Sequence, residues 1–118
     1  MADTIETFFA AWGETDPDAR LEAIAGTLAT GFVYCDPRTG GRITTEDELL
    51  DYIAAYTEQA PGWWAKVERV DTHHGYHRVL VGFGEGDETR MRGTYFAELD
   101  ELGRIELLAG FRGDGAAE

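Results

Sequence analysis

The chain has 118 residues, which suits a single domain, and with 43% hydrophobic and 12% aromatic residues its composition excludes a disordered protein. With 23 acidic and 10 basic residues the formal net charge is -13, so nucleic acids and membranes are not expected partners. The single cysteine excludes an intrachain disulfide, and the N-terminal residues resemble neither a signal peptide nor a membrane span, so we expect a cytoplasmic protein.

Three helices are predicted in the first half of the chain. Apolar residues at positions i, i+3, i+4 and i+7 predict the first helix over about residues 4–12. Asp16, followed by proline, is the expected N-cap of the second helix. The apolar stripe of that helix runs to Leu28, and Gly31 is expected to end it. The third helix follows the N-cap Thr45 and ends before a Pro-Gly pair.

The remaining segments have the period of two that is typical of strands. Because short turns join the last four strands, we expect an antiparallel sheet, with a bulge in the first of these four. Glycines within the strands indicate that the sheet bends strongly. The predicted fold class is α+β, with three N-terminal helices on a strongly curved antiparallel sheet that forms a cone. Residues 1–112 make up this domain and residues 113–118 a flexible tail, and strands are predicted at 32–36, 63–73, 76–84, 88–99 and 104–112.

The two faces of the predicted sheet differ in character. Alternation places His77, Phe83, Tyr95 and Phe111 on the face that the helices cover. The opposite face mixes apolar and charged residues, which is typical of a protein interface, although scattered apolar residues are also normal on a surface. We therefore expect a homodimer through the outer face, formed by Trp64, Leu80, Phe96 and Leu108.

Five segments in order carry a family resemblance: TFFAAW, DPDARLEAIAGTLATGFVYCDP, APGW, VDTHHGYHRV and GTYFAELDELGRIELLAGF. These segments are spread over nearly the whole chain, which resembles the nuclear transport factor 2-like superfamily, in particular its small SnoaL-like, ketosteroid isomerase-like bacterial members. The resemblance implies a cone-shaped domain that usually dimerises through the back of its sheet. It leaves the activity open, because this fold hosts isomerases, dehydratases, cyclases, epoxide hydrolases and non-enzymatic binding domains.

The resemblance also assigns roles to individual residues. Asp36, in the DP pair, takes the position of the general base of the ketosteroid isomerases, and Tyr95 takes the position of the acid that hydrogen-bonds the enolate oxygen. Those enzymes also use a tyrosine on the first helix, where this chain has Phe8 and Phe9. From the residues alone, the favoured interpretation of an aspartate before proline is the cap of the turn that follows it.

Two further residues join the catalytic candidates. Tyr34 shares a face with Asp36, and His77 lies on the apolar face, where it is either an acid or base beside Asp36 or a core histidine bonded to a neighbour. His73 and His74 point to opposite faces of a strand, so no metal site is expected. Cys35 is interpreted as a small buried hydrophobic residue.

An aromatic-rich cone end suits a flat, apolar ligand, although the same side chains are first of all core residues. We expect a domain that binds a small apolar carbonyl compound without a cofactor, with acid/base chemistry of the isomerase, cyclase or dehydratase type. The alternative is a non-catalytic ligand-binding module or a dimeric protein-interaction module. The predicted pocket residues are Phe8, Phe9, Trp12, Tyr52, Tyr56, Trp63, Phe83, Met91 and Phe111.

Overall fold

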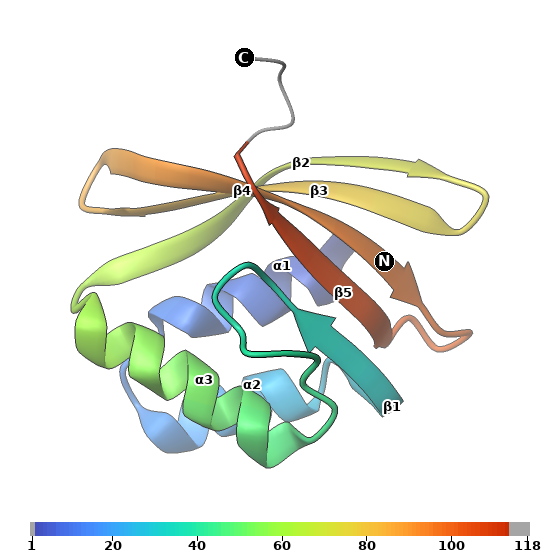
Figure 1. Ribbon diagram of the computed structural model, residues 1–118, viewed down its shortest axis with the longest axis horizontal. Coiled ribbons are helices and arrows are strands. Elements are labelled where there is room, and N and C mark those ends of the chain that lie inside the picture. The colour runs from blue at the N-terminus through green and yellow to red at the C-terminus, as the bar shows by residue number, and fades with distance from the viewer. Residues whose placement is uncertain (1, 114–118) are drawn as a thin grey trace.

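The computed structural model describes residues 2–113, with side chains from residue 4 onward. Three helices precede most of the sheet, and all of them lie on one side of it (Figure 1). The elements in chain order are α1 (Ala2–Ala10), the 3-10 turn η1 (Ala11–Gly13), α2 (Pro17–Ala25), β1 (Leu28–Cys35), α3 (Glu46–Gln59), β2 (Trp63–His73), β3 (Tyr76–Glu85), β4 (Glu88–Leu99) and β5 (Ile105–Arg112).

The helix starts follow the predicted capping chemistry. The Asp16 side chain accepts a hydrogen bond from the backbone N–H of Asp18, and Thr45 accepts one from the backbone N–H of Glu48. The predicted end of the second helix is wrong. It ends at Ala25, and β1 already begins three residues later.

The physical reason for this error lies in the dual role of the apolar residues after α2. Leu28 continues the helical stripe, but in the structure it pairs with Ile105 of β5. Gly31 lies inside β1 with a φ of 79°, where the pairing with β5 shifts its register. The glycine therefore serves a strand irregularity and not a helix end.

The sheet has five strands in the order β1-β5-β4-β3-β2, and it is curved and not closed. The expectation of an antiparallel sheet holds for β2 to β5 but is wrong for the edge strand β1, which runs parallel to β5. The chain reaches this parallel position through α3 and the β2–β4 meander, which together form the long crossover that parallel strands need. The predicted bulge in β2 is confirmed between Val67 and Arg69.

A second bulge changes the faces of β5. Glu98 pairs with Leu107 and Leu99 pairs with Ile105, so β5 has one extra residue at Glu106. From there on, every side chain of β5 points to the face opposite to the predicted one.

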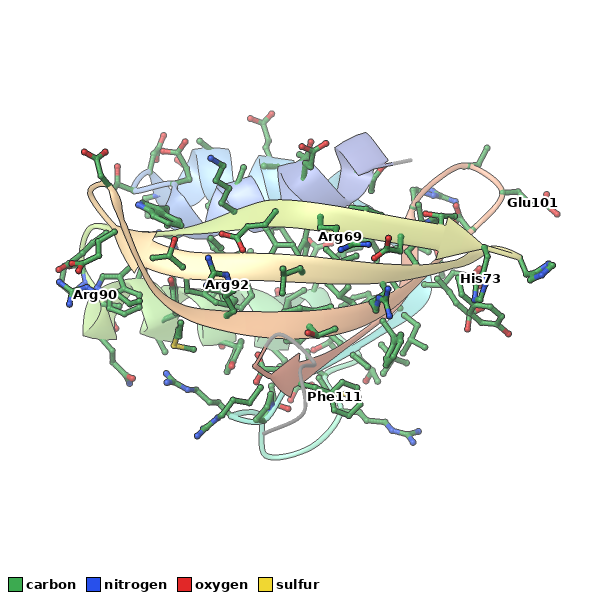
Figure 2. The ribbon with its side chains drawn as sticks, turned by 90° about the horizontal axis from the view of Figure 1, so that it is seen from above. Arg69, His73, Arg90, Arg92, Glu101 and Phe111 are labelled. Carbon is green, nitrogen blue, oxygen red and sulfur yellow. The ribbon has the colours of Figure 1, made fainter. Side chains whose placement is uncertain are left out.

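This reversal corrects two predicted positions. Leu108 is fully buried against the helices and is no part of the outer face. Phe111, labelled in Figure 2, lies on the same side as Phe96. The ring centroids of the two residues are 5.8 Å apart.

The core combines aliphatic and aromatic side chains and lies between the helices and the inner face of the sheet. Ile5, Phe8 and Phe9 of α1 are fully buried. At the end of β5, Gly113 still donates its N–H to the carbonyl of Arg92, and the rest of the predicted tail lies outside the described residues. None of the helices in the described part of the chain combines the length and the apolar character that crossing a membrane requires.

Candidate functional site

The loop after β1 carries a carboxylate, Asp36, that lies on the wall of a cavity. Tyr34 and Ile43 exchange two backbone hydrogen bonds of 2.9 and 2.7 Å, which closes the loop between them. Within this loop the Oδ1 atom of Asp36 accepts hydrogen bonds from the backbone N–H groups of Arg38 (2.8 Å) and Thr39 (3.2 Å). Asp36 therefore does cap its own turn, which was one of its two predicted roles.

Asp36 is also the centre of a cluster of tyrosine hydroxyls. Its Oδ2 atom accepts a hydrogen bond of 2.6 Å from Tyr34, and the Tyr52 hydroxyl lies 2.7 Å from both carboxylate oxygens. The hydroxyls of Tyr34 and Tyr95 are 3.4 Å apart. Two backbone and two side-chain donors thus occupy a carboxylate that has about four acceptor positions.

The tyrosines of this cluster are neutral donors at physiological pH. Burial is the largest cause that raises the pKa of Tyr34, Tyr52 and Tyr95 above its ordinary value, and the nearby charge of Asp36 raises all three further. Burial also raises the pKa of Tyr56 to about 12. Each hydroxyl therefore keeps its proton, and each can donate only one hydrogen bond.

Because each hydroxyl has only one proton to donate, Tyr95 differs from its two neighbours. Tyr34 and Tyr52 each direct their proton at Asp36, over 2.6 and 2.7 Å. Within residues 4–113, Tyr95 has only the oxygen of Tyr34 as an acceptor, at 3.4 Å, which is long for an O–H donor. Of the hydroxyls in the cluster, that of Tyr95 therefore loses the weakest hydrogen bond when it turns to donate to a bound ligand.

A cavity of about 250 Å³ opens beside this cluster. It lies between the end of the third helix, the loop after β1 and the β4–β5 side of the sheet. This volume is below the usual range for drug-sized ligands, so the cavity suits a smaller molecule. Its wall is formed by Trp12, Asp36, Pro37, Arg38, Tyr52, Tyr56, Phe83, Met91, Arg92, Gly93, Tyr95, Phe111 and Arg112.

The structure brings together most, but not all, of the predicted pocket residues. Tyr34 stands behind the wall, 1% exposed, and reaches the cavity only through Asp36 and Tyr95. Phe8 and Phe9 are core residues below the cavity, and Trp63 does not contribute to its wall. The predicted residues found on the wall are Trp12, Tyr52, Tyr56, Phe83 and Met91, together with Phe111, whose ring nevertheless packs on Phe96 on the outer side of the sheet.

His77 does not lie beside Asp36, contrary to one of its two predicted roles. It is buried at the end of β3 that joins the β2–β3 hairpin, and its Nδ1 atom is 2.8 Å from the hydroxyl of Thr72. Figure 2 shows His73 of this hairpin and Arg90 at opposite ends of the sheet, and the cavity is at the end of Arg90. Burial lowers the pKa of His77, as expected for a core histidine.

Three features of the site were not predicted from the sequence. The first is the bond of Tyr52 to Asp36, which joins residues 16 positions apart. The second is the indole N–H of Trp12, which is buried and has no acceptor among the described residues. The third is the presence of Arg38 and Arg112 on the wall. The third helix carries Tyr52 on its apolar stripe, so only the orientation of its hydroxyl was missing from the pattern.

Three solved structures show what this chain resembles. A SnoaL-like family protein of Agrobacterium tumefaciens, provisionally described as an isomerase, has 23% identity and a TM-score of 0.83, over 96% of this chain and 97% of its own. A protein of Kribbella flavida provisionally described as a ketosteroid isomerase has 24% identity and a TM-score of 0.68, over 98% of this chain and 79% of its own. A Sinorhizobium meliloti protein provisionally described as a polyketide cyclase has 22% identity and a TM-score of 0.71, over 93% of this chain and 94% of its own.

These similarities confirm the predicted fold. At this level of identity they show the fold alone, and the three proteins carry three different descriptions of activity. No sequence-family model matches the chain, and a search of curated proteins finds no similar sequence.

Proposed function

We propose that this domain of the nuclear transport factor 2-like fold binds a small, largely apolar carbonyl compound in its cavity. The observation that carries the proposal is the Tyr95 hydroxyl, a neutral donor on an aromatic cavity wall whose only acceptor among the described side chains is 3.4 Å away. The ligand oxygen accepts a hydrogen bond from this hydroxyl, and the aromatic wall covers the apolar part of the ligand.

The buried N–H of Trp12 supports a ligand with a hydrogen-bond acceptor. Trp12 lies on the cavity wall, is 2% exposed, and has no acceptor for its Nε1 proton among residues 4–113. A buried donor without a partner costs about 1–3 kcal/mol, so such groups are uncommon unless a bound molecule satisfies them. Because the Nε1 atom has almost no accessible surface, a carbonyl oxygen in the cavity would bind it only after the indole ring turns.

The reaction that suits this arrangement is proton transfer at the carbon next to the carbonyl. Asp36 takes the proton from carbon, the electron pair moves to the carbonyl oxygen, and Tyr95 hydrogen-bonds the enolate; the proton then returns to carbon. Because four donors already bind the carboxylate, Tyr52 must turn away from Asp36 before a substrate reaches it.

The four hydrogen bonds that Asp36 already accepts also favour a second candidate function, ligand binding without catalysis. In that case Asp36 only holds Tyr34 and Tyr52 in place, and the cavity stores or carries its ligand.

Titration with 1-tetralone, a flat bicyclic ketone, tests the proposal. We expect saturable binding that Tyr95→Phe weakens at least about fivefold, the effect of losing one hydrogen bond of roughly 1 kcal/mol. Tyr76→Phe is the matched control, because Tyr76 is 56% exposed and is not on the cavity wall. Absence of binding, or equal effects of the two variants, would contradict the proposal.

Exchange of the α-protons of 1-tetralone in D₂O separates the two functions. If Asp36 is a base, wild-type protein accelerates the exchange, Asp36→Asn abolishes the acceleration, and Tyr95→Phe lowers it about 10²-fold or more. Binding without any acceleration over buffer would identify the domain as a binding module.

We also propose that the domain forms a homodimer through the outer face of the sheet. Phe96 and Phe111 are 51% and 55% exposed and pack edge to face, which leaves an apolar patch next to Leu80. Trp64, also predicted at this interface, lies on the same face and donates its indole N–H to the carbonyl of Gly86.

Phe96→Glu is expected to convert the dimer into a monomer, because it places a charge in the centre of an apolar contact. Light scattering at micromolar concentration measures the mass. Glu98→Gln, on the same face of the same strand, is the control and should leave the mass unchanged. A wild-type monomer would contradict the proposal.

A further inference from the structure

The charged residues of the cavity wall are mostly positive, whereas the molecule as a whole is strongly negative. The chain carries a formal net charge of -13, and only 10 of its residues are Lys or Arg. Three arginines nevertheless belong to the cavity wall, against the one carboxylate of Asp36. A local excess of positive charge on an acidic protein attracts an anionic ligand to this one place.

The guanidinium of Arg92 is held away from the cavity. Arg92 lies on the outer face of the sheet (Figure 2), where its Nε atom donates to Glu68 over 2.7 Å. Its contribution to the cavity is therefore that of its backbone, next to Gly93. The charge available to a ligand comes from the other two arginines, Arg38 and Arg112.

Arg112 points to the cavity side of the sheet. It pairs with Gly93 across the β4–β5 ladder, and paired residues share a face, which here is the face of Tyr95. Because Gly93 has no side chain, nothing covers Arg112 from that neighbour. Arg112 is exposed, and within residues 4–113 it has no ion pair with a carboxylate.

Arg38 belongs to the wall of the same cavity and lies in the loop that Asp36 caps. Its backbone N–H is fixed by the Oδ1 atom of Asp36 at 2.8 Å, and its side chain is exposed. Burial raises the pKa of Tyr52, Tyr56 and Tyr95, and the positive charge of Arg38 opposes that rise at all three. No carboxylate of the described side chains forms an ion pair with Arg38.

We infer that the ligand carries a carboxylate at its outer end, and that Arg38 and Arg112 bind this group at the cavity mouth while the apolar part of the ligand lies inside. The planar, fork-like guanidinium matches a carboxylate with two parallel hydrogen bonds. This inference rests on the proposed function, because it names the class of ligand for the same cavity. It adds that the ligand is an aromatic or alicyclic keto acid and not a neutral ketone.

The test compares 2-naphthoate with its neutral isostere 2-naphthamide by titration calorimetry at low salt. Wild-type protein is expected to bind 2-naphthoate about tenfold tighter or more, as for a charge-assisted contact, and added salt should reduce this preference. The double variant Arg38→Gln/Arg112→Gln should remove the preference, because it lowers the affinity for 2-naphthoate more than the affinity for 2-naphthamide. Arg42→Gln is the matched control, since Arg42 is exposed in the same loop but is not on the cavity wall.

The outcomes separate this inference from the proposed function. Equal affinities of wild-type protein for the two probes would overturn the inference and leave the proposed function intact. An equal loss of preference in Arg42→Gln would also overturn it, because the effect would then come from the general charge of the loop. Binding of neither probe would overturn the proposed function, and the inference with it.

Discussion

Replacing Asp36 with alanine is expected to lower the free energy of unfolding by about 3 kcal/mol. The change leaves the hydroxyl of Tyr34, which is 1% exposed, with only the distant oxygen of Tyr95 as an acceptor. It also removes the acceptor of Tyr52 and the cap that binds the N–H groups of Arg38 and Thr39. Urea denaturation measures the loss as a lower midpoint with an unchanged slope.

Asp87→Ala provides the control for this prediction, because Asp87 is an exposed aspartate in the β3–β4 turn. We expect it to change the stability by no more than about 0.5 kcal/mol. A loss below about 1 kcal/mol for Asp36→Ala would show that Asp36 only caps an exposed turn, as a single cap of that kind is worth this much. The hydrogen bonds from Tyr34 and Tyr52 to Asp36 would then contribute little to the free energy of unfolding.

Gly110→Ala is expected to destabilise the domain by about 1–3 kcal/mol and to weaken binding of 1-tetralone, because it pushes Tyr95 out of position. A Cβ atom at Gly110 would lie 2.5, 2.8 and 2.9 Å from three carbons of the Tyr95 ring. That ring is 4% exposed and packs edge to face on Phe9 at a centroid distance of 4.9 Å, so it has little room to move.

The control for this second variant is Gly40→Ala, where a Cβ atom would meet nothing within 4 Å. Its unfolding free energy and its affinity for 1-tetralone should both stay close to those of wild-type protein. If Gly110→Ala loses stability but binds 1-tetralone normally, the position of Tyr95 does not matter for binding, and its assigned role as donor is wrong.

Local patterns in the sequence were sufficient for the starts of α2 and α3 and for the hairpins from β2 to β5, but they misplaced the end of α2. The place of Asp36 in a ligand site came from the family resemblance. The chemistry of the helix starts and hairpins lies within a few residues, as in the caps at Asp16 and Thr45. The parallel pairing of β1 with β5 was not predictable in this way, because it joins segments separated by most of the domain. A turn sequence marks an antiparallel hairpin, whereas no short motif marks a parallel neighbour.

The errors at Leu108 and Phe111 have one cause. A single extra residue at Glu106 reverses the faces of the rest of β5, and alternation read from the sequence has no means to detect it. The candidate site was similarly incomplete. Asp36 and Tyr95 were expected there, but the donors Trp12 and Tyr52 depend on side-chain directions that only the packed structure defines.

The central claim, that the cavity holds a carbonyl ligand, is tested most directly by the indole N–H signals of ¹⁵N-labelled protein during the titration with 1-tetralone. Trp12→Phe identifies the signal of Trp12, and Trp64, bonded outside the cavity to the Gly86 carbonyl at 3.0 Å, is the internal reference. The Trp12 signal is expected to shift and saturate while that of Trp64 stays in place. A Trp12 signal that does not move, or that moves together with that of Trp64, would contradict the claim.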